Sequence, residues 1–183
     1  MKIKSNATPL ELSSPFYLAN EQFCHDFERF IASKQGKVKG VYNAWSYSIY
    51  GKIETGKAWD LKYKKATYSG GSIWFSSKYQ NLLTLAEWKC HDFGTNDTSF
   101  VVRKKKFLDL LNPSFSKVDT HENYVIKAKK GKPRVLPQLV SILKPLFESK
   151  EIYKITCKNN TLIIELRNEG HHFDIFNQLI QLS

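Results

Sequence analysis

Apolar and polar residues follow two different periods along this chain, and each change of period marks an expected element. Four aromatic or aliphatic residues near the start recur with helical spacing: Phe23, Phe27, Phe30 and Ile31. This stripe predicts a helix over residues 20–34, with Asn20 as its N-cap and Gly36 as its stop. Residues 1–18 show no period and are expected to be irregular.

The next segment changes to the two-residue period of half-buried strands. The apolar members of two such strands alternate with polar neighbours: Trp45, Tyr47, Ile49 and Ile53, then Trp59, Leu61 and Tyr63. Glu54-Thr55-Gly56 is the expected turn between them, and Ser69-Gly70-Gly71 is a second turn. Further strands are predicted at residues 73–75 and 100–102. Residues 82–90 fit a strand or a helix, and we favour a strand because the neighbouring segments form a meander.

The last third of the chain predicts the order β-α-β-β-α. Strands are expected at residues 124–128, 152–157 and 162–166, with Asn159-Asn160 as the hairpin turn of the last two. A helical stripe lies between the first and second of these strands: Leu136, Leu139, Val140, Leu143, Leu146 and Phe147. Pro137 suits its first turn, and Pro145 is expected to kink or end it. Phe173, Phe176, Leu179 and Ile180 predict a closing amphipathic helix.

These elements indicate an α+β fold, in which an N-terminal helix and antiparallel meander pack with the C-terminal β-α-β-β-α unit. The length of 183 residues suits a single compact domain spanning 1–183. Sub-halves are expected at 1–106 and 123–183. The segment 107–122, which contains Asn112-Pro113, is expected to join them.

This arrangement resembles an uncharacterised bacterial domain of unknown function. The resemblance rests on the aromatic helix, the Gly51 to Gly56 spacing followed by Lys57, Phe115, and Tyr-Val-Ile-Lys at 124–127 leading into β-α-β-β-α. It implies a bacterial source, and relatives of that domain sometimes accompany transmembrane segments. It implies no activity, cofactor or functional residue.

Composition narrows the class of protein. Hydrophobic residues make up 42% of the chain and aromatic residues 14%, and no apolar run approaches the roughly 18 to 20 residues that a membrane span needs. The start of the chain lacks the apolar region of a secretory signal. Cys24, Cys90 and Cys157 are far apart, which is typical of reduced thiols. We therefore expect a cytoplasmic protein without a transmembrane segment.

The net charge of +11 is unevenly distributed. Residues 101–134 carry 10 Lys and Arg against 3 Asp and Glu, whereas residues 135–183 carry 5 of each. Because a basic surface attracts nucleic acid, anionic lipid or acidic protein, this excess is the main functional signal.

The candidate anion-binding residues lie in three basic runs: Lys62, Lys64, Lys65, Arg103, Lys104, Lys105, Lys106, Lys127, Lys129, Lys130, Lys132 and Arg134. The favoured hypothesis is a non-enzymatic interaction module whose basic face binds an acidic protein. The alternative is sequence-independent nucleic-acid binding, with Tyr63, Tyr68 and Tyr124 available for base stacking. A peripheral anionic membrane surface is a less favoured partner. Lysines that only maintain solubility or block edge pairing would give the same pattern.

Catalytic signals are weaker than the charge pattern. Cys24-His25 and Cys90-His91 offer zinc ligands, which leaves a Cys/His metal-dependent enzyme as the third hypothesis. Adjacent residues point in different directions, however, so each pair supplies one ligand at most. The spacing from Gly51 to Gly56 lacks the Lys-Ser/Thr of a phosphate loop and is expected to be a hairpin turn. We predict no cofactor, no metal site and no catalytic residue.

Overall fold

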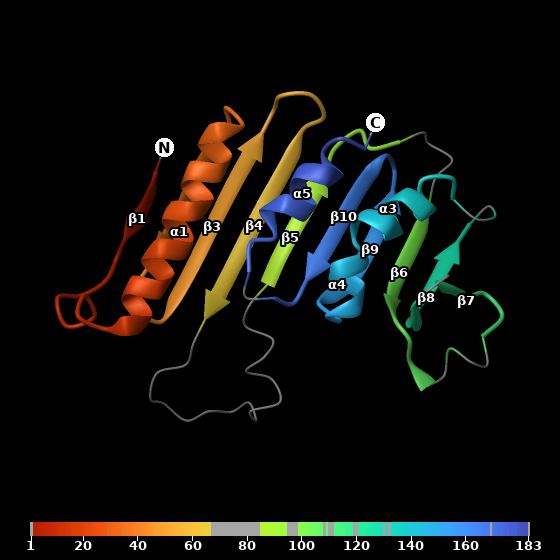
Figure 1. Ribbon diagram of the computed structural model, residues 1–183, viewed down its shortest axis with the longest axis horizontal. Helices are drawn as coiled ribbons and strands as arrows, with labels where there is room; N and C mark the ends of the chain where they lie inside the picture. Colours follow the sequence, from red (N-terminus) through yellow and green to blue (C-terminus); the bar gives the residue numbers. More distant parts are fainter. Residues whose placement is uncertain are drawn as a thin grey trace. The chain divides into compact units, whose positions relative to one another are not determined.

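The computed structural model describes residues 2–66, 85–94, 99–107, 109, 112–118, 121–129, 131, 133–168 and 170–182. These residues form an α+β fold with four helices and ten strands (Figure 1). The helices are α1 (Pro15–Ser33), α3 (Leu136–Ile142), α4 (Lys144–Glu148) and α5 (Phe173–Leu179). The strands are β1 (Ile3–Ser5), β2 (Lys37–Tyr42), β3 (Ser46–Ile53), β4 (Trp59–Ala66), β5 (Leu85–Cys90), β6 (Phe100–Lys104), β7 (Ser116–Val118), β8 (His121–Ala128), β9 (Ile152–Lys158) and β10 (Thr161–Leu166).

The chain forms two compact units. The first comprises Met1–Trp88 with Arg167–His171, and the second comprises Lys89–Leu166 with His172–Ser183. The expected division at 107–122 does not coincide with this one, because β6 pairs with both β8 and β9. Residues on both sides of that segment therefore belong to the second unit.

Helix α1 of the first unit begins five residues before its predicted start. Ser14 is its N-cap, since its side-chain oxygen accepts a hydrogen bond from the backbone N–H of Phe16, and Pro15 occupies the first turn. Asn20 is therefore not the cap. Its buried amide instead donates to the carbonyl oxygens of Asn43 and Ala44, at 2.9 and 3.1 Å. This ties the helix to the turn before β3.

The sheet of the first unit is mixed. β1 pairs with β2 in parallel, and β2, β3 and β4 form an antiparallel meander. The turn after β3 and the buried faces of β3 and β4 confirm the predicted strands, but β1 and β2 were not predicted. Trp45 was expected inside and is 37% exposed instead, because it lies in the turn before β3, where its ring is 6.0 Å from that of Phe16.

Helix α1 packs on one face of this meander, against β2 and β3. A chain of aromatic groups extends that core. The indole nitrogen of Trp88 donates to the hydroxyl of Tyr63 at 2.9 Å, and this hydroxyl donates to the carbonyl oxygen of His171 at 2.7 Å. The His171 ring stacks on Phe23 with a centroid distance of 3.6 Å. His171 thus lies in an aromatic packing layer.

In the second unit the strand order is β10-β9-β6-β8-β7, with antiparallel pairing throughout the described registers. The predicted β-α-β-β-α order is confirmed, although β6 from the preceding segment inserts between β8 and β9. The Asn159-Asn160 hairpin turn is also confirmed. Both residues have positive φ, at 50° and 58°, as a tight two-residue turn requires.

The predicted helix at 136–147 is interrupted as expected. It forms α3 and α4, separated at Leu143, because Pro145 has no N–H to continue the helical ladder. Leu139, Leu143 and Leu146 are buried. α3, α4 and α5 lie over the same face of this unit's sheet (Figure 1), and α3 packs against α5.

Two further predicted segments can be compared with the structure only where their residues are described. Residues 85–90 form β5, which confirms a strand there. The strand predicted at 73–75, the turn at 69–71, residues 82–84 and Tyr68 lie outside the described residues.

Candidate anion-binding surfaces

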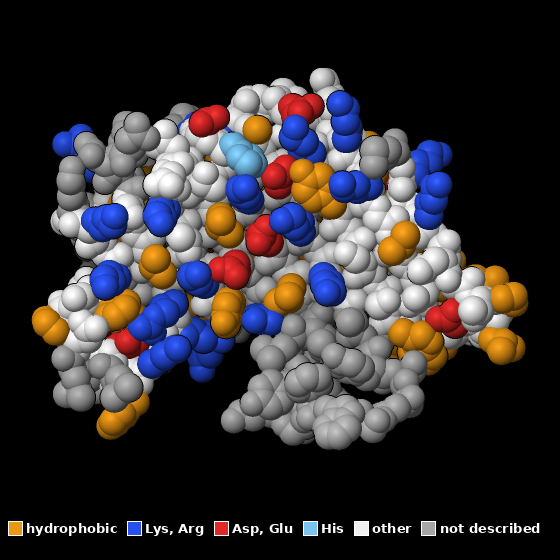
Figure 2. All heavy atoms as spheres, turned by 180° about the vertical axis from the view of Figure 1, so that it is seen from behind, with side chains coloured by type: hydrophobic (Ala, Val, Ile, Leu, Met, Phe, Trp, Pro, Cys, Tyr) orange, Lys and Arg blue, Asp and Glu red, His pale blue; other side chains and the backbone are white. Residues whose placement is uncertain are grey.

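The two faces of the second unit's sheet differ in chemistry. Tyr124 of β8 points to the helix-covered face, where its ring meets Phe147 of α4 at 4.8 Å. Because side chains alternate along a strand, Val125 and Lys127 point to the other face. Register places Arg103 of β6 and Lys117 of β7 on either side of Val125 on this helix-free face. Figure 2, seen from behind, shows many Lys and Arg side chains with fewer Asp and Glu between them.

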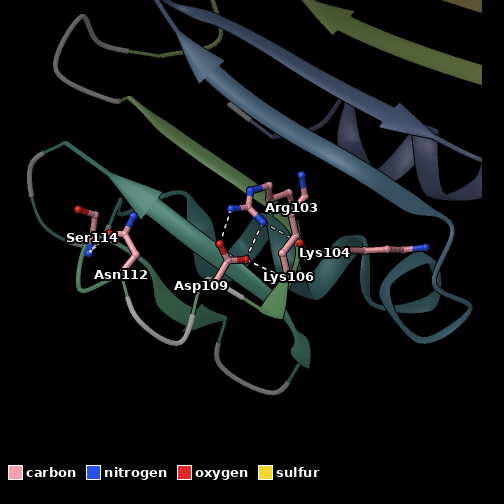
Figure 3. A network of polar contacts seen from close by, with 6 residues as sticks. All are labelled: Arg103, Lys104, Lys106, Asp109, Asn112 and Ser114. Carbon is pink, nitrogen blue, oxygen red and sulfur yellow. Dashed lines mark hydrogen bonds and ion pairs between the residues drawn. The ribbon is translucent and has the colours of Figure 1, made fainter.

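Arg103 and Asp109 form the polar anchor of this face (Figure 3). The two guanidinium nitrogens Nη1 and Nη2 lie 2.7 and 2.6 Å from the carboxylate oxygens Oδ2 and Oδ1. Oδ2 also accepts from the backbone N–H of Lys106 at 2.6 Å. Hydrogen bonds from Arg103 lower the pKa of Asp109 to about 2, and the same bonds raise the pKa of Arg103. The pair is ionised at neutral pH, and it holds the loop that follows β6 against the end of that strand.

Phe115 lies beside this anchor with cations around its ring. The Arg103 guanidinium carbon is 4.5 Å from the ring centroid and the Lys127 ammonium is 5.8 Å from it. An open groove of about 330 Å³ runs beside Phe115, and Lys105, Lys117 and Val125 also line it. We name Lys105, Phe115, Lys117 and Lys127 the Phe115 cluster.

The three lysines of this cluster form no ion pair with a described residue. No carboxylate of a described residue lies within ion-pair distance of their ammonium groups, and the nearby Asp109 is already paired with Arg103. Lys117 and Lys127 are exposed, and Lys105 is half-buried. Within the part of the chain that the structure describes, the cluster therefore presents positive charge without an acidic partner around a half-buried aromatic ring.

The remaining predicted residues of this unit do not all join the cluster. Lys104 is the next residue after Arg103 on β6, so the two side chains point to opposite faces of the sheet. The Lys104 side chain points away from Asp109 (Figure 3). Lys106, Lys129 and Arg134 are exposed in the segments that follow β6 and β8. Lys130 and Lys132 lie outside the described residues. The side chains of the Arg103–Lys106 run therefore point in different directions, since successive side chains alternate.

Lys62, Lys64 and Lys65 belong to the first unit and form a separate surface. Lys62 and Lys64 lie on the face of β4 opposite α1, whereas Lys65 pairs with buried Tyr47 and lies on the helix-covered side. Lys65 therefore does not extend the surface of Lys62 and Lys64. The Lys62 ammonium is also 2.8 Å from the Glu87 carboxylate, which offsets its charge.

Tyr50 occupies the centre of that surface. Cross-strand register places Lys39 of β2 and Lys62 of β4 on either side of it. The Lys39 ammonium lies 5.2 Å from the Tyr50 ring centroid, and the Tyr50 hydroxyl donates to Asp60 at 2.6 Å. Burial and this carboxylate raise the pKa of Tyr50 to about 12. A shallow groove of about 590 Å³, lined also by Lys64, follows this row.

Sequence reasoning missed several members of both surfaces. Lys39 lies on β2, which was not predicted, and Lys117 lies on a three-residue strand inside the expected linker. Isolated lysines carry little signal beside long basic runs. Alternation within Lys37–Tyr42 was the only available indication for Lys39.

The candidate metal and nucleophile residues have other surroundings. Among the described residues, no three His, Cys, Asp or Glu side chains gather as a metal site would require. The His121 ring stacks on Phe147 at 4.6 Å, and Nε2 of His172 lies 2.6 Å from Oε2 of Glu151. All three cysteines are buried and unbridged. Burial, with Glu21 and Glu28 nearby, raises the pKa of Cys24 to about 12, which opposes thiolate formation.

No protein-family model matches this chain, and no curated protein shows significant sequence similarity to it. None of the described helices combines the length and hydropathy that crossing a bilayer requires.

Proposed function

We propose that this protein is a non-enzymatic interaction module that binds an acidic protein partner through the Phe115 cluster. One observation carries the proposal. Asp109, which lines the same groove, is held by two bonds from Arg103, while Lys105, Lys117 and Lys127 have no acidic partner among the described residues.

The arrangement suits recognition of carboxylates. Lysine ammonium groups on flexible stems adapt to acidic side chains, and their field accelerates encounter with a negatively charged surface. The half-buried ring of Phe115 and the side chain of Val125 give the groove an apolar floor. Apolar contact of this kind adds affinity that charge alone does not supply in water.

The non-enzymatic part of the proposal rests on the state of the reactive side chains. Burial raises the pKa of both Cys24 and Cys157, so neither thiol is poised as a nucleophile. His121 and His171 stack on aromatic rings. These groups serve packing, which supports an interaction role over catalysis.

Fluorescence polarisation with labelled poly-L-glutamate tests the proposal. Replacing Lys105, Lys117 and Lys127 together by Gln is expected to weaken binding by at least about tenfold. The matched control replaces the exposed residues Lys4, Lys144 and Lys150 by Gln, which changes the net charge equally. Equal losses in both triple variants would show that only net charge matters and would contradict a defined site.

The surface around Tyr50, which includes Lys39, Lys62 and Lys64, favours a second candidate function, sequence-independent binding of single-stranded nucleic acid. An aromatic ring on an open sheet face, with Lys39 and Lys64 near it, offers stacking for a base and cations for phosphates. Tyr50→Leu is expected to weaken binding of labelled oligouridylate about tenfold, whereas Tyr50→Phe retains the ring and the binding. Tyr153→Leu, at a tyrosine 46% exposed on β9, is the control. No binding by the unmodified protein at low salt would exclude this function.

A further inference from the structure

Strand β7 is the last strand in the order of the second unit. Two hydrogen bonds at the ends of the pairing between β8 and β6 show to which side the N–H and C=O groups of β7 point. The N–H of Lys105 donates to the carbonyl oxygen of Asn123 at 2.8 Å, and the N–H of Lys129 donates to that of Ser99 at 3.0 Å. In an antiparallel ladder, bonded pairs alternate along each strand. Asn123, Val125, Lys127 and Lys129 therefore direct their backbone groups towards β6.

The alternate residues of β8, which lie between these four, direct their backbone N–H and C=O groups towards β7. Ile126 is paired with Ser116, so these two residues exchange the bonds between β8 and β7. Lys117 follows Ser116, so its backbone N–H and C=O groups point to the side opposite to those of Ser116. Its N–H and C=O thus point away from β8, and among the described residues no strand lies beyond β7.

A groove lies on each face of this edge strand. The groove of about 330 Å³ contains Lys105, Phe115 and Val125 on the helix-free face. A second groove, of about 370 Å³, contains Ile126, Ala128 and Pro133 on the opposite face. Ser116 and Lys117 line both grooves. An added strand would direct its alternate side chains into the two grooves in turn.

The side chains that line the two grooves indicate which added strand would fit. The first groove has Lys105 and Lys117 on its rim. The second has the apolar side chains of Ile126, Ala128 and Pro133 in its lining, together with Ser114, Ser116 and Lys117. A strand that alternates acidic and apolar residues complements both. A second copy of β7 does not fit, because Lys117 would then approach another basic edge.

We propose that β7 accepts an extended acidic segment of a partner protein as an additional strand, with acidic side chains facing Lys105 and Lys117 and apolar ones facing Ile126. This inference rests on the proposed function and adds the binding mode and the sequence pattern of the partner. The register shift after Lys117 keeps the added ladder short. Main-chain bonds centre on Lys117.

The test uses a labelled peptide of alternating Glu and Val and a peptide of the same composition with its Glu and Val residues in separate blocks. The alternating peptide is expected to bind more tightly, because only its side chains match both grooves. Lys117→Gln removes a charge but keeps the outward N–H. Lys117→Pro removes both, and an edge strand tolerates proline where the N–H faces solvent. Lys117→Pro should therefore bind the alternating peptide roughly fivefold more weakly than Lys117→Gln.

A second arm keeps the test decisive if Lys117→Pro fails to fold. The unmodified protein is titrated with the alternating peptide carrying backbone N-methyl groups on one edge, which is expected to bind roughly tenfold more weakly. Equal binding of the alternating, block and N-methylated peptides would overturn strand addition while leaving the acidic-partner function intact. Absence of binding to poly-L-glutamate as well would instead overturn the proposed function itself.

Discussion

Arg103 and Asp109 meet through two parallel hydrogen bonds of 2.7 and 2.6 Å, with the Asp109 side chain only 7% exposed. This bidentate geometry is the strongest that a guanidinium and a carboxylate form. The pair joins the end of β6 to the loop that leads towards Phe115. It therefore holds the backbone of the candidate site without contributing net charge to it.

The Arg103–Asp109 pair predicts a pH dependence of stability. The pKa of Asp109 is lowered to about 2 in the folded protein and is about 3.9 in an unfolded chain. The carboxylate therefore stabilises the fold above pH ~4, and this contribution is lost as the pH falls towards ~2. Thermal melts should show this loss in the unmodified protein and lack it in Asp109→Asn. Asp174→Asn, at an exposed position, is the control. Parallel pH profiles for the unmodified protein and Asp109→Asn would contradict the pairing.

Gly51 of β3 lies directly beneath helix α1. A Cβ atom there would approach Ile31 Cδ1 to 2.7 Å and Phe27 Cζ to 2.8 Å, closer than van der Waals contact permits. Gly51→Ala should therefore destabilise the first unit by about 1–3 kcal/mol. Chemical denaturation measures the change. Gly94→Ala is the matched control, because a Cβ at that position meets no atom of a described residue within 4 Å. An unchanged midpoint for Gly51→Ala would refute the close packing of α1 on β3.

Leu143 lies fully buried at the junction of α3 and α4. Its truncation removes apolar contacts and leaves a cavity, so Leu143→Ala should cost about 2–5 kcal/mol. Urea unfolding gives this value, with the exposed Ser141→Ala as the control. Similar stabilities for the two variants would mean that the helical stripe does not face the core.

The cysteines provide a chemical test of burial. Cys24, Cys90 and Cys157 are each at most 1% exposed, and burial raises the pKa of Cys24 and of Cys157. A thiol-specific chromophoric reagent should therefore react slowly with the native protein and release three equivalents per chain after denaturation. Rapid reaction of one thiol in the native state would identify a reactive cysteine and reopen the enzymatic hypothesis.

Much of the fold was predictable because periodicity reports which side chains are buried. The alternation in β3 and β4 and the interruption at Pro145 both follow from local geometry. The start of α1 was also available in the sequence, since Ser14-Pro15 is a helix-start pair. Asn20 was misread because a polar residue within a helix resembles a cap when its tertiary partners are unknown.

The pairing of distant segments could not be predicted in the same way. Insertion of β6 between β8 and β9 depends on contacts far apart in the sequence, and it makes residues 107–122 an internal connection of the second unit. The basic runs indicated a charged surface, but a run does not say which way each side chain points. Alternation separates Lys65 from Lys64, and tertiary pairing offsets the charges of Arg103 and Lys62.

The salt dependence of poly-L-glutamate binding tests the central claim most directly. Affinity is measured from roughly 50 mM to roughly 300 mM salt, a range over which screening of exposed charges increases strongly. If the Phe115 cluster is the docking site, the unmodified protein loses affinity steeply with salt, and the variant with Lys105, Lys117 and Lys127 changed to Gln shows a much shallower slope. The same slope in both proteins would contradict this account.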